Sequence, residues 1–144
     1  MQQKLQNNQN LVLDVFNKVH NKYDLMNNLM SFGVHKSWKK QLIYSMNPKP
    51  NKKLIDVACG TGDIAKLFID STKNLSKVEC VDPNKKMISL GKNKLNNCKN
   101  ISWKVASAER LPFKDAQFDY YTISFGLRNT KNLNRSLSEA FRVL

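Results

Sequence analysis

Short apolar runs alternate with helical stretches from about residue 50 onward, and this alternation restricts the fold more than any other feature of the sequence. The apolar runs cover residues 53–58, 77–82, 101–106 and 118–125, and helical stretches begin at about Asp63, Asn84 and Leu133. Strands that alternate with helices imply βαβ crossovers and a parallel sheet. The run at residues 54–58 lacks a regular alternation of polar and apolar residues, which is typical of strands buried on both faces. We therefore predict a doubly wound α/β fold of parallel strands flanked by helices.

The first 50 residues have a different pattern and are predicted to form a separate helical segment. Between residues 12 and 30 the apolar side chains stand three or four positions apart, the spacing of one amphipathic helix or of a pair of short ones. A second helix is expected from about His35, with one apolar face formed by Trp38, Leu42, Ile43 and Met46. Pro48 and Pro50 then end it, because proline lacks a backbone donor and restricts the residue before it. This places a boundary between an N-terminal helical segment, 1–50, and an α/β core, 51–144.

The chain is strongly basic, with 24 Lys and Arg residues against 11 Asp and Glu residues and a formal net charge of +13. Such a balance raises nucleic acid or an anionic membrane as a partner. However, 20 of the basic residues are Lys and only four are Arg, and they are scattered along the chain. Base recognition usually relies on Arg, and the sequence has neither a zinc-finger spacing nor an RNP-type strand. We therefore interpret the charge as a solvated surface rich in Lys and Asn, and nucleic acid is not the predicted partner.

The cysteines and the hydropathy pattern exclude other classes of protein. The three cysteines contain no CxxC pair, so the spacing predicts neither a zinc site nor a disulfide framework, and no metal ligand is assigned. No apolar run approaches the roughly 18 residues that a transmembrane helix needs, and the first ten residues lack the apolar centre of a signal peptide. We expect a soluble protein of a reducing, cytoplasmic compartment.

The strongest local motif is a glycine-containing turn between the first predicted strand and its helix, with the sequence DVACGTGD at residues 56–63. Gly60 and Gly62 can adopt positive φ and let backbone amides approach a ligand closely. Such a turn also directs the free N–H groups of the helix into the crevice at the strand ends. Twenty residues beyond Gly62, at the end of the next predicted strand, Asp82 can accept hydrogen bonds from both hydroxyls of a ribose. Together these residues predict a site for a cofactor that contains a nucleoside.

The spacing alone leaves two cofactor classes open. Residues 60–65, GTGDIA, satisfy the dinucleotide fingerprint G-x-G-x-x-G/A, whereas a phosphate-binding P-loop is excluded because no Gly-Lys-Ser/Thr follows. Asp63 places a carboxylate in the first turn of the helix, where it repels a pyrophosphate but not a sulfonium or ammonium group. Asp56 adds negative charge just before the glycines. The electrostatics therefore favour S-adenosylmethionine over NAD.

Three blocks of sequence resemble the ubiquinone/menaquinone biosynthesis C-methyltransferase family (UbiE), a branch of the class I S-adenosylmethionine-dependent methyltransferases. The first block comprises VFNKV at 15–19, YDLMN at 23–27 and MSFGVHKSWK at 30–39. The second is LIDVACGTGDIA at 54–65, and the third runs from ERLPF at 109–113 through FD at 118–119 to SFGLRN at 124–129. The middle block is shared widely among methyltransferases, whereas the first block and FGLRN are more specific to this family. The resemblance implies a Rossmann-like class I methyltransferase sheet.

The resemblance also implies roles for individual residues. Thr61 matches a cofactor-contacting Thr in the glycine turn, and Asp82 matches the acid that binds the ribose. Ser107 and Ala108 fall where the family has an Asn-Ala or Asp-Ala pair beside the adenine, and Ser124 falls on a cofactor-contacting Ser. Ser107 departs from the usual Asn or Asp, and its hydroxyl reaches less far. The expected cofactor contacts are thus Gly60, Thr61, Gly62, Asp82, Ser107, Ala108 and Ser124.

The implied reaction is methylation of a ring carbon of a polyprenylated benzoquinol or demethylmenaquinol. Arg128, which follows a predicted strand end beside Asn129, is the expected group that orients the substrate and stabilises a phenolate. Asp63 and Tyr23 are weaker candidates for the base that helps to remove a proton from the substrate. His35 matches a family histidine, although capping or packing is the more common role for a single His at a helix start.

The resemblance further implies a small-molecule quinol partner and leaves open peripheral association with the inner membrane, a homodimer or a quinone-biosynthesis complex. In a host with organelles the expected compartment is the mitochondrial matrix. The family pattern continues beyond residue 144, so we expect a fragment that is incomplete at the C-terminal end of the sheet. The alternatives are another small-molecule class I methyltransferase, an NAD(P)-dependent oxidoreductase or a nucleic-acid-binding module.

Overall fold

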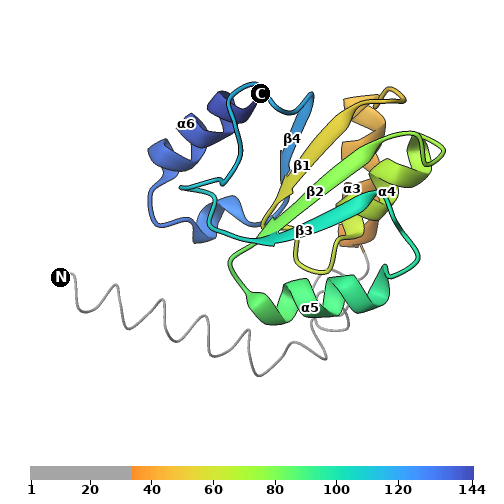
Figure 1. Ribbon diagram of the computed structural model, residues 1–144, viewed down its shortest axis with the longest axis horizontal. Coiled ribbons are helices and arrows are strands. Elements are labelled where there is room, and N and C mark those ends of the chain that lie inside the picture. Colours follow the sequence, from red (N-terminus) through yellow and green to blue (C-terminus); the bar gives the residue numbers. More distant parts are fainter. Residues whose placement is uncertain (1–33) are drawn as a thin grey trace. The chain divides into compact units, whose positions relative to one another are not determined.

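The computed structural model describes residues 34–144, and these form a parallel sheet with helices on both faces (Figure 1). Close contacts divide the chain into two units, residues 1–38 and residues 39–144, and the whole sheet belongs to the second unit. In chain order the elements are α3 (Val34–Met46), β1 (Lys53–Val57), α4 (Asp63–Ser71), β2 (Lys77–Asp82), α5 (Lys85–Lys94), β3 (Ile101–Val105), β4 (Tyr120–Ile123), the 3-10 helix η2 (Leu127–Asn129) and α6 (Leu133–Val143). The one or two helices predicted within residues 12–30 and the candidate base Tyr23 lie outside the described residues. The functional division at residue 50 stays a prediction.

The four strands have the order β3-β2-β1-β4, and all three pairings are parallel. Leu54 of β1 stands opposite Val78 of β2 on one side and Tyr120 of β4 on the other. This confirms the predicted α/β fold and its parallel sheet. Because all strands are parallel, their carboxyl ends meet at one edge of the sheet, where the turns that follow β1, β2, β3 and β4 gather.

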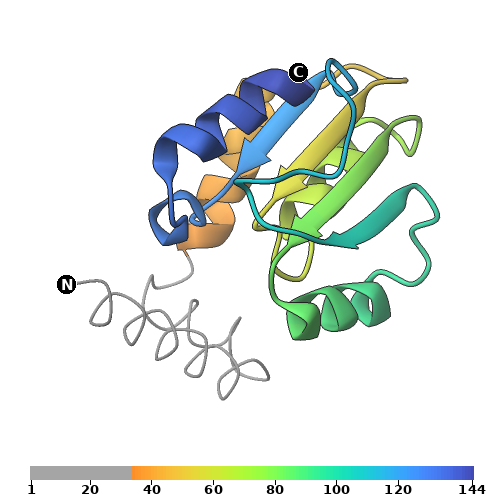
Figure 2. The same cartoon turned by 60° about the vertical axis from the view of Figure 1, so that its left-hand side comes forward.

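Each face of the sheet has its own apolar core. On one face Leu54, Val78 and Cys80 pack with Phe68 and Ile69 of α4. On the other face the core contains Ile55, Val57 and Val81 together with Val143 of α6. Consequently α4 and α6 lie on opposite faces of the sheet, as Figure 2 shows. The near-complete burial of β1 explains why its sequence lacks alternation.

Two details of the predicted elements are wrong. The fourth strand begins at Tyr120 rather than at Phe118, because the Phe118 amide donates to the carbonyl of Val143 and its ring is buried against Phe113. In α3, Trp38 does not share the apolar face of Ile43, since the two residues are about 140° apart around a helix. The Trp38 residue is 54% exposed whereas Ile43 is 6% exposed. Among the described residues, no helix is long and apolar enough to span a membrane.

Candidate cofactor site

The turn that links β1 to α4 has the backbone conformation that its glycines predict. Gly60 and Gly62 have φ values of 56° and 85°, and the Gly62 amide donates to the carbonyl of Cys59 at 3.0 Å. A Cβ atom at Gly62 would lie 2.7 Å from Cη2 of Trp103, so this position requires glycine for space as well as for φ. Apart from its two chain neighbours, residues 34–144 place no atom within 4 Å of a Cβ built at Gly60. The turn is therefore tightly packed at Gly62 and open at Gly60, where a ligand can approach the backbone.

Asp82, at the end of β2, contacts this turn directly. Its Oδ2 accepts a hydrogen bond from the Gly60 amide at 2.9 Å, and its Oδ1 accepts one from the Asn84 amide at 2.8 Å. Burial raises the pKa of the Asp82 carboxyl, and the two amide donors oppose that rise. Each carboxylate oxygen has a second lone pair that can accept a ligand hydroxyl. The structure thus brings Asp82 to the glycine turn, 22 positions from Gly60 in the sequence.

Asp63 is bound by two lysines. Lys39 of α3 donates to its Oδ2 at 2.6 Å, and Lys94 of α5 donates to its Oδ1 at 2.7 Å and to Oγ1 of Thr61 at 3.2 Å. Burial raises the pKa of Asp63, but the two lysines outweigh this effect and hold the pKa at about 2. With both oxygens engaged in ion pairs, Asp63 is a poor proton acceptor near neutral pH.

These ion pairs also change the electrostatic reasoning about the cofactor. Asp63 contributes one negative charge, and Lys39 and Lys94 contribute two positive charges beside it. Their sum is positive, so the argument that Asp63 repels a pyrophosphate is wrong. Lys39 and Lys94 were not identified from the sequence, and the only signal was the paired Lys39-Lys40 after Trp38. The electrostatic preference for a cationic ligand must come from another carboxylate.

That carboxylate is Asp56, which lies in β1 immediately before the turn. It is 1% exposed, and Thr122 of β4 donates to its Oδ1 at 2.8 Å. Its Oδ2 is buried and has no hydrogen-bond partner among the described residues. Burial raises the pKa of Asp56 to about 7, more than the Thr122 hydrogen bond lowers it. A nearby positive charge would favour the ionised form of Asp56, because such a charge compensates for the missing partner.

The loop after β3 begins beside Asp82 and carries the expected adenine-binding pair. The Ala106 amide donates to the Asp82 carbonyl at 3.3 Å, which places the next residues at the same edge of the sheet. Ser107 is half-buried and forms an isolated antiparallel β-bridge with Arg110. Ala108 is 7% exposed and belongs to the core cluster that contains Val143 of α6. The loop is therefore anchored on the sheet where a ligand bound at Asp82 would extend.

The turn after β4 closes the other side of the site. Ser124 is half-buried, and a Cβ atom at Gly126 would lie 2.3 Å from Cβ of Ala58, which follows β1. This close approach joins the SFGLRN segment to the glycine turn, a contact that the sequence did not reveal. Arg128 lies in η2 and is exposed, and it has no ion pair within residues 34–144.

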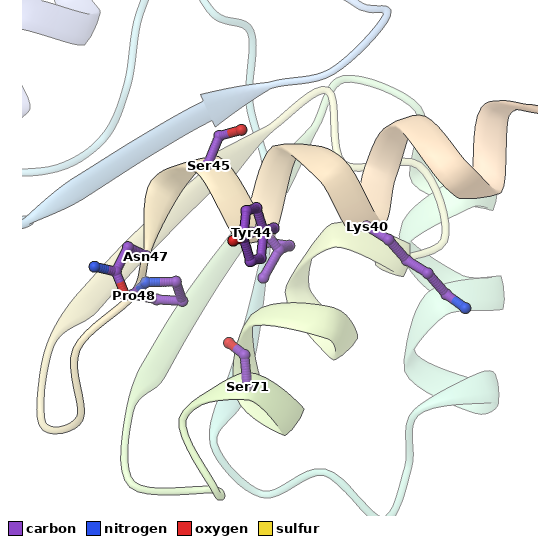
Figure 3. Close-up of a pocket in the computed structure, with 7 residues that line it drawn as sticks. Lys40, Tyr44, Ser45, Asn47, Pro48 and Ser71 are labelled. Atoms are coloured by element: carbon purple, nitrogen blue, oxygen red, sulfur yellow. The ribbon is translucent and has the colours of Figure 1, made fainter.

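An open groove lies away from these residues. It runs between α3 and the C-terminal end of α4 (Figure 3), and its lining is Lys40, Ile43, Tyr44, Ser45, Asn47, Pro48 and Ser71. The glycine turn is at the opposite, N-terminal end of α4. His35, in the first turn of α3, is 6% exposed. Residues 34–144 contain no cluster of three or more His, Cys, Asp or Glu side chains that could hold a metal ion.

The chain is similar to known proteins over almost its whole length. The ubiE/COQ5 methyltransferase family matches residues 2–144. The chain is 47% identical over 148 residues to the ubiquinone/menaquinone biosynthesis C-methyltransferase UbiE of Rickettsia bellii, covering 98% of this chain and 59% of that protein. It is 46% identical over 141 residues to the UbiE protein of Brucella anthropi, covering 94% of this chain and 54% of that protein. The chain thus spans little more than half the length of these curated relatives.

Solved structures share the fold. A structure described as a SAM-dependent methyltransferase from Aquifex aeolicus superimposes with a TM-score of 0.67 at 20% identity, covering 73% of this chain and 57% of that one. The putative methyltransferase in complex with the Trm112 activator of Haloferax volcanii superimposes with a TM-score of 0.76 at 18% identity, covering 90% of this chain and 55% of that one. At these identities the likeness concerns the fold alone, and it agrees with the predicted class I methyltransferase sheet.

Proposed function

The chain belongs to the ubiE/COQ5 methyltransferase family, and on this premise we propose that it binds S-adenosylmethionine at its glycine turn and methylates a ring carbon of a polyprenylated quinol. The observation that carries the proposal is the contact of Asp82 with the Gly60 amide at 2.9 Å. It places a buried carboxylate beside an open backbone turn at the carboxyl ends of parallel strands, where doubly wound sheets bind nucleotides. The residues present therefore fit an adenosyl cofactor.

Each part of the cofactor has proposed partners among the described residues. Asp82 accepts the two ribose hydroxyls through the lone pairs that its amide donors leave free. The backbone at Gly60, Thr61 and Gly62 contacts the methionyl group. Ser124, which directly follows β4, contacts the same part of the cofactor. Ser107 and Ala108 border the adenine. Asp56 supplies the negative field behind the turn that favours a sulfonium group.

S-adenosylmethionine, when bound, supplies an electrophilic methyl group, and the ring carbon forms its new bond as the carbon–sulfur bond breaks. The protein must then align the two reactants, exclude water and accept the ring proton. We propose Arg128 as the group that orients the quinol oxygen and stabilises its phenolate, because it is exposed beside the turn after β4 and has no ion pair within the described chain. Asp63 is not retained as a base, since its pKa is about 2. Tyr23 stays a prediction.

The UbiE names of the relatives refer to ubiquinone and menaquinone biosynthesis, so the proposed substrate is a benzoquinol or naphthoquinol with an apolar tail. A substrate of this kind resides in a lipid bilayer, and the net charge of +13 supports peripheral association with anionic lipid. Homodimer formation and membership of a quinone-biosynthesis complex are further proposals, and they rest on the family to which the chain belongs.

A dinucleotide is the second candidate ligand, because Lys39 and Lys94 place two ammonium groups beside the turn. Isothermal titration of the protein with S-adenosylmethionine and with NAD distinguishes the two classes. We expect tighter binding of S-adenosylmethionine; tighter binding of NAD would overturn the proposal. Asp82→Asn replaces a charged acceptor of two hydroxyls, so the affinity for S-adenosylmethionine should fall roughly 10-fold to 100-fold.

Asp70→Asn is the matched control for this substitution. Asp70 is an exposed carboxylate on α4 that pairs with Lys66 one helical turn away. The Asp70→Asn substitution should leave the affinity for S-adenosylmethionine unchanged. Circular dichroism checks that both variants fold. Equal affinity of the wild-type protein and Asp82→Asn would refute the assigned site.

A further inference from the structure

The loop between β3 and β4 is held by α6 along most of its length. This loop, residues 106–119, contains the proposed adenine-binding pair Ser107 and Ala108. Two buried loop residues, Ala108 and Leu111, belong to the same core cluster as Val143 of α6. The hydrogen bonds that α6 side chains and the loop share come from two groups of residues, one at each end of the helix, and the amides of residues 116–118 also donate to the carbonyls of Arg142 and Val143.

The first group is centred on Arg142, in the last turn of α6. Its Nε and Nη2 donate to both carboxylate oxygens of Glu139, at 2.7 and 2.9 Å. The same guanidinium donates to the carbonyl of Leu111 at 3.0 Å and to that of Phe113 at 2.8 Å. A fifth hydrogen bond, at 2.8 Å, reaches Oδ1 of Asp115. One side chain therefore holds three positions of the loop, and its planar fork gives these contacts a defined geometry.

Glu139 completes this group by contacting the loop itself. Its Oε2 accepts a hydrogen bond from the Leu111 amide at 2.7 Å. The ion pair with Arg142 lowers the pKa of Glu139 to about 2, so its charge persists at all but strongly acidic pH. The amide of Leu111 thus binds Glu139, and the carbonyl of Leu111 binds Arg142. Both polar backbone groups of this one loop residue are bound by α6.

The second group lies at the N-terminal end of α6. Oε1 of Glu109 accepts hydrogen bonds from the amide of Lys131 at 2.6 Å and from that of Asn132 at 3.4 Å. Nε of Arg135 donates to the carbonyl of Glu109 at 3.1 Å. Glu109 directly follows the Ser107-Ala108 pair. The proposed adenine-binding residues are therefore followed by a first attachment at Glu109 and a second at Leu111.

The rest of the proposed cofactor site has different supports. Asp82 is held by amides of the glycine turn and of Asn84, and Asp63 is held by lysines of α3 and α5. None of these four hydrogen bonds involves α6. A change at Arg142 should consequently disturb the adenine end of the site and leave the ribose and methionyl ends as they are.

We propose that Arg142 and Glu139 are positioning residues for adenine recognition, which act by fixing the backbone of the loop at Leu111 and Phe113. This inference rests on the proposed function, because it requires an adenosyl cofactor. It makes α6, which contributes no residue to the proposed cofactor contacts, responsible for the selectivity of the site for its base. Loss of the Arg142 side-chain contacts should loosen the loop at Leu111 and Phe113, while the attachments at Glu109 and at residues 116–118 stay, and so reduce the alignment of Ser107 and Ala108 with the base.

The test compares two ligands that differ only in the base: S-adenosylhomocysteine and S-inosylhomocysteine, in which a carbonyl replaces the adenine amino group. A loop that is aligned with adenine should bind the adenosyl compound about ten times more tightly, the value of one good hydrogen bond. Arg142→Gln should reduce this preference to less than about threefold. A general loss of folded protein would weaken both ligands by the same factor and leave the ratio unchanged.

Three further measurements complete the test. Glu139→Gln keeps an acceptor for the Leu111 amide but removes the charge that holds Arg142, so the preference should fall to a value between those of the wild-type protein and Arg142→Gln. Lys66→Gln breaks an exposed pair on α4 and should leave the ratio at the wild-type value. Hydrogen exchange of the unliganded proteins should show faster exchange of the amides in residues 107–113 in Arg142→Gln than in Lys66→Gln or the wild-type protein.

The outcomes separate this proposal from the proposed function. If the wild-type protein binds neither ligand, the cofactor assignment fails and the positioning role fails with it. If the wild-type protein binds both ligands equally, or if Arg142→Gln keeps the full preference for adenine, the cofactor assignment stands and the positioning role is refuted.

Discussion

Replacement of Asp56 by Asn should make the protein more stable above neutral pH, although Asp56 is a buried side chain with a well-formed hydrogen bond. Asp56 is 1% exposed, and its Oδ2 has no partner among the described residues. Asn is close in shape to the protonated acid, and its Oδ1 can still accept the hydrogen bond that Thr122 donates at 2.8 Å. The substitution therefore removes a buried charge and keeps the contact with β4, while the unpaired amide group that replaces Oδ2 adds a cost that does not change between pH 5 and pH 8.

The pKa of Asp56 determines the size of the effect. Burial raises this pKa from 3.8 to about 7, and a tenfold change in proton affinity corresponds to about 1.4 kcal/mol. Since the folded state binds this proton more tightly than the unfolded chain does, the contribution of Asp56 to stability is greatest below about pH 4 and is lost as the pH rises through about 7. The full cost of ionising the buried group is about 4 kcal/mol, and about 3 kcal/mol of it develops between pH 5 and pH 8.

Urea denaturation of both proteins at pH 5 and pH 8 measures this difference directly. The free energy of unfolding of Asp56→Asn should gain about 3 kcal/mol relative to the wild-type protein between the two pH values. Most other titrations cancel, because both proteins contain the same remaining groups. Asp70→Asn, which changes an exposed carboxylate, should show no such gain. A difference between Asp56→Asn and the wild-type protein that stays constant from pH 5 to pH 8 would refute the burial argument.

Two further predictions concern the supports of the glycine turn. Asp63→Asn breaks both lysine ion pairs and should destabilise the protein by about 1–3 kcal/mol near neutral pH. Because the pKa of Asp63 is about 2, this difference in the free energy of unfolding should disappear as the pH falls from about 4 toward 2. Urea denaturation across that range measures it, and a difference that stayed constant would contradict the argument. Gly62→Ala meets both a positive φ and the ring of Trp103 at 2.7 Å, whereas Gly60→Ala meets only a positive φ. Thermal unfolding should therefore show a loss of about 1–2 kcal/mol for Gly60→Ala and a clearly larger loss for Gly62→Ala; equal losses would mean that Trp103 moves aside freely.

The fold and the centre of the site were predictable because both depend on local patterns. The alternation of apolar runs and helical stretches correctly predicted four parallel strands, and the central strand β1 is buried on both faces as its unbroken apolar run indicated. The spacing from Gly62 to Asp82 predicted that the turn and the acid share one edge of the sheet, and the hydrogen bond from the Gly60 amide to Asp82 confirms that they meet. Parallel topology makes this outcome general, because consecutive strands point the same way.

The charge state of the site was not predictable in the same way. Asp63 was expected to present negative charge to a ligand, but Lys39 and Lys94 neutralise it from 24 and 31 positions away in the sequence. Asp56 also counts as a full negative charge in the sequence pattern, whereas its burial in the structure raises its pKa to about 7 and disfavours the charged form. Ion pairs and desolvation depend on which elements pack together, and the sequence pattern around a carboxylate contains no record of that packing.

The sequence by itself therefore determined the order of the elements, the glycine turn and the acid that faces it, because periodicity and glycine conformation act over a few residues. Only the tertiary structure decided which side chains carry charge at the site and which element holds the loop between β3 and β4. The contacts of Arg142 with Leu111 and Phe113 span 31 and 29 positions. They exist because α6 packs on the face of the sheet that this loop crosses, and such packing is a property of the assembled core rather than of any local pattern.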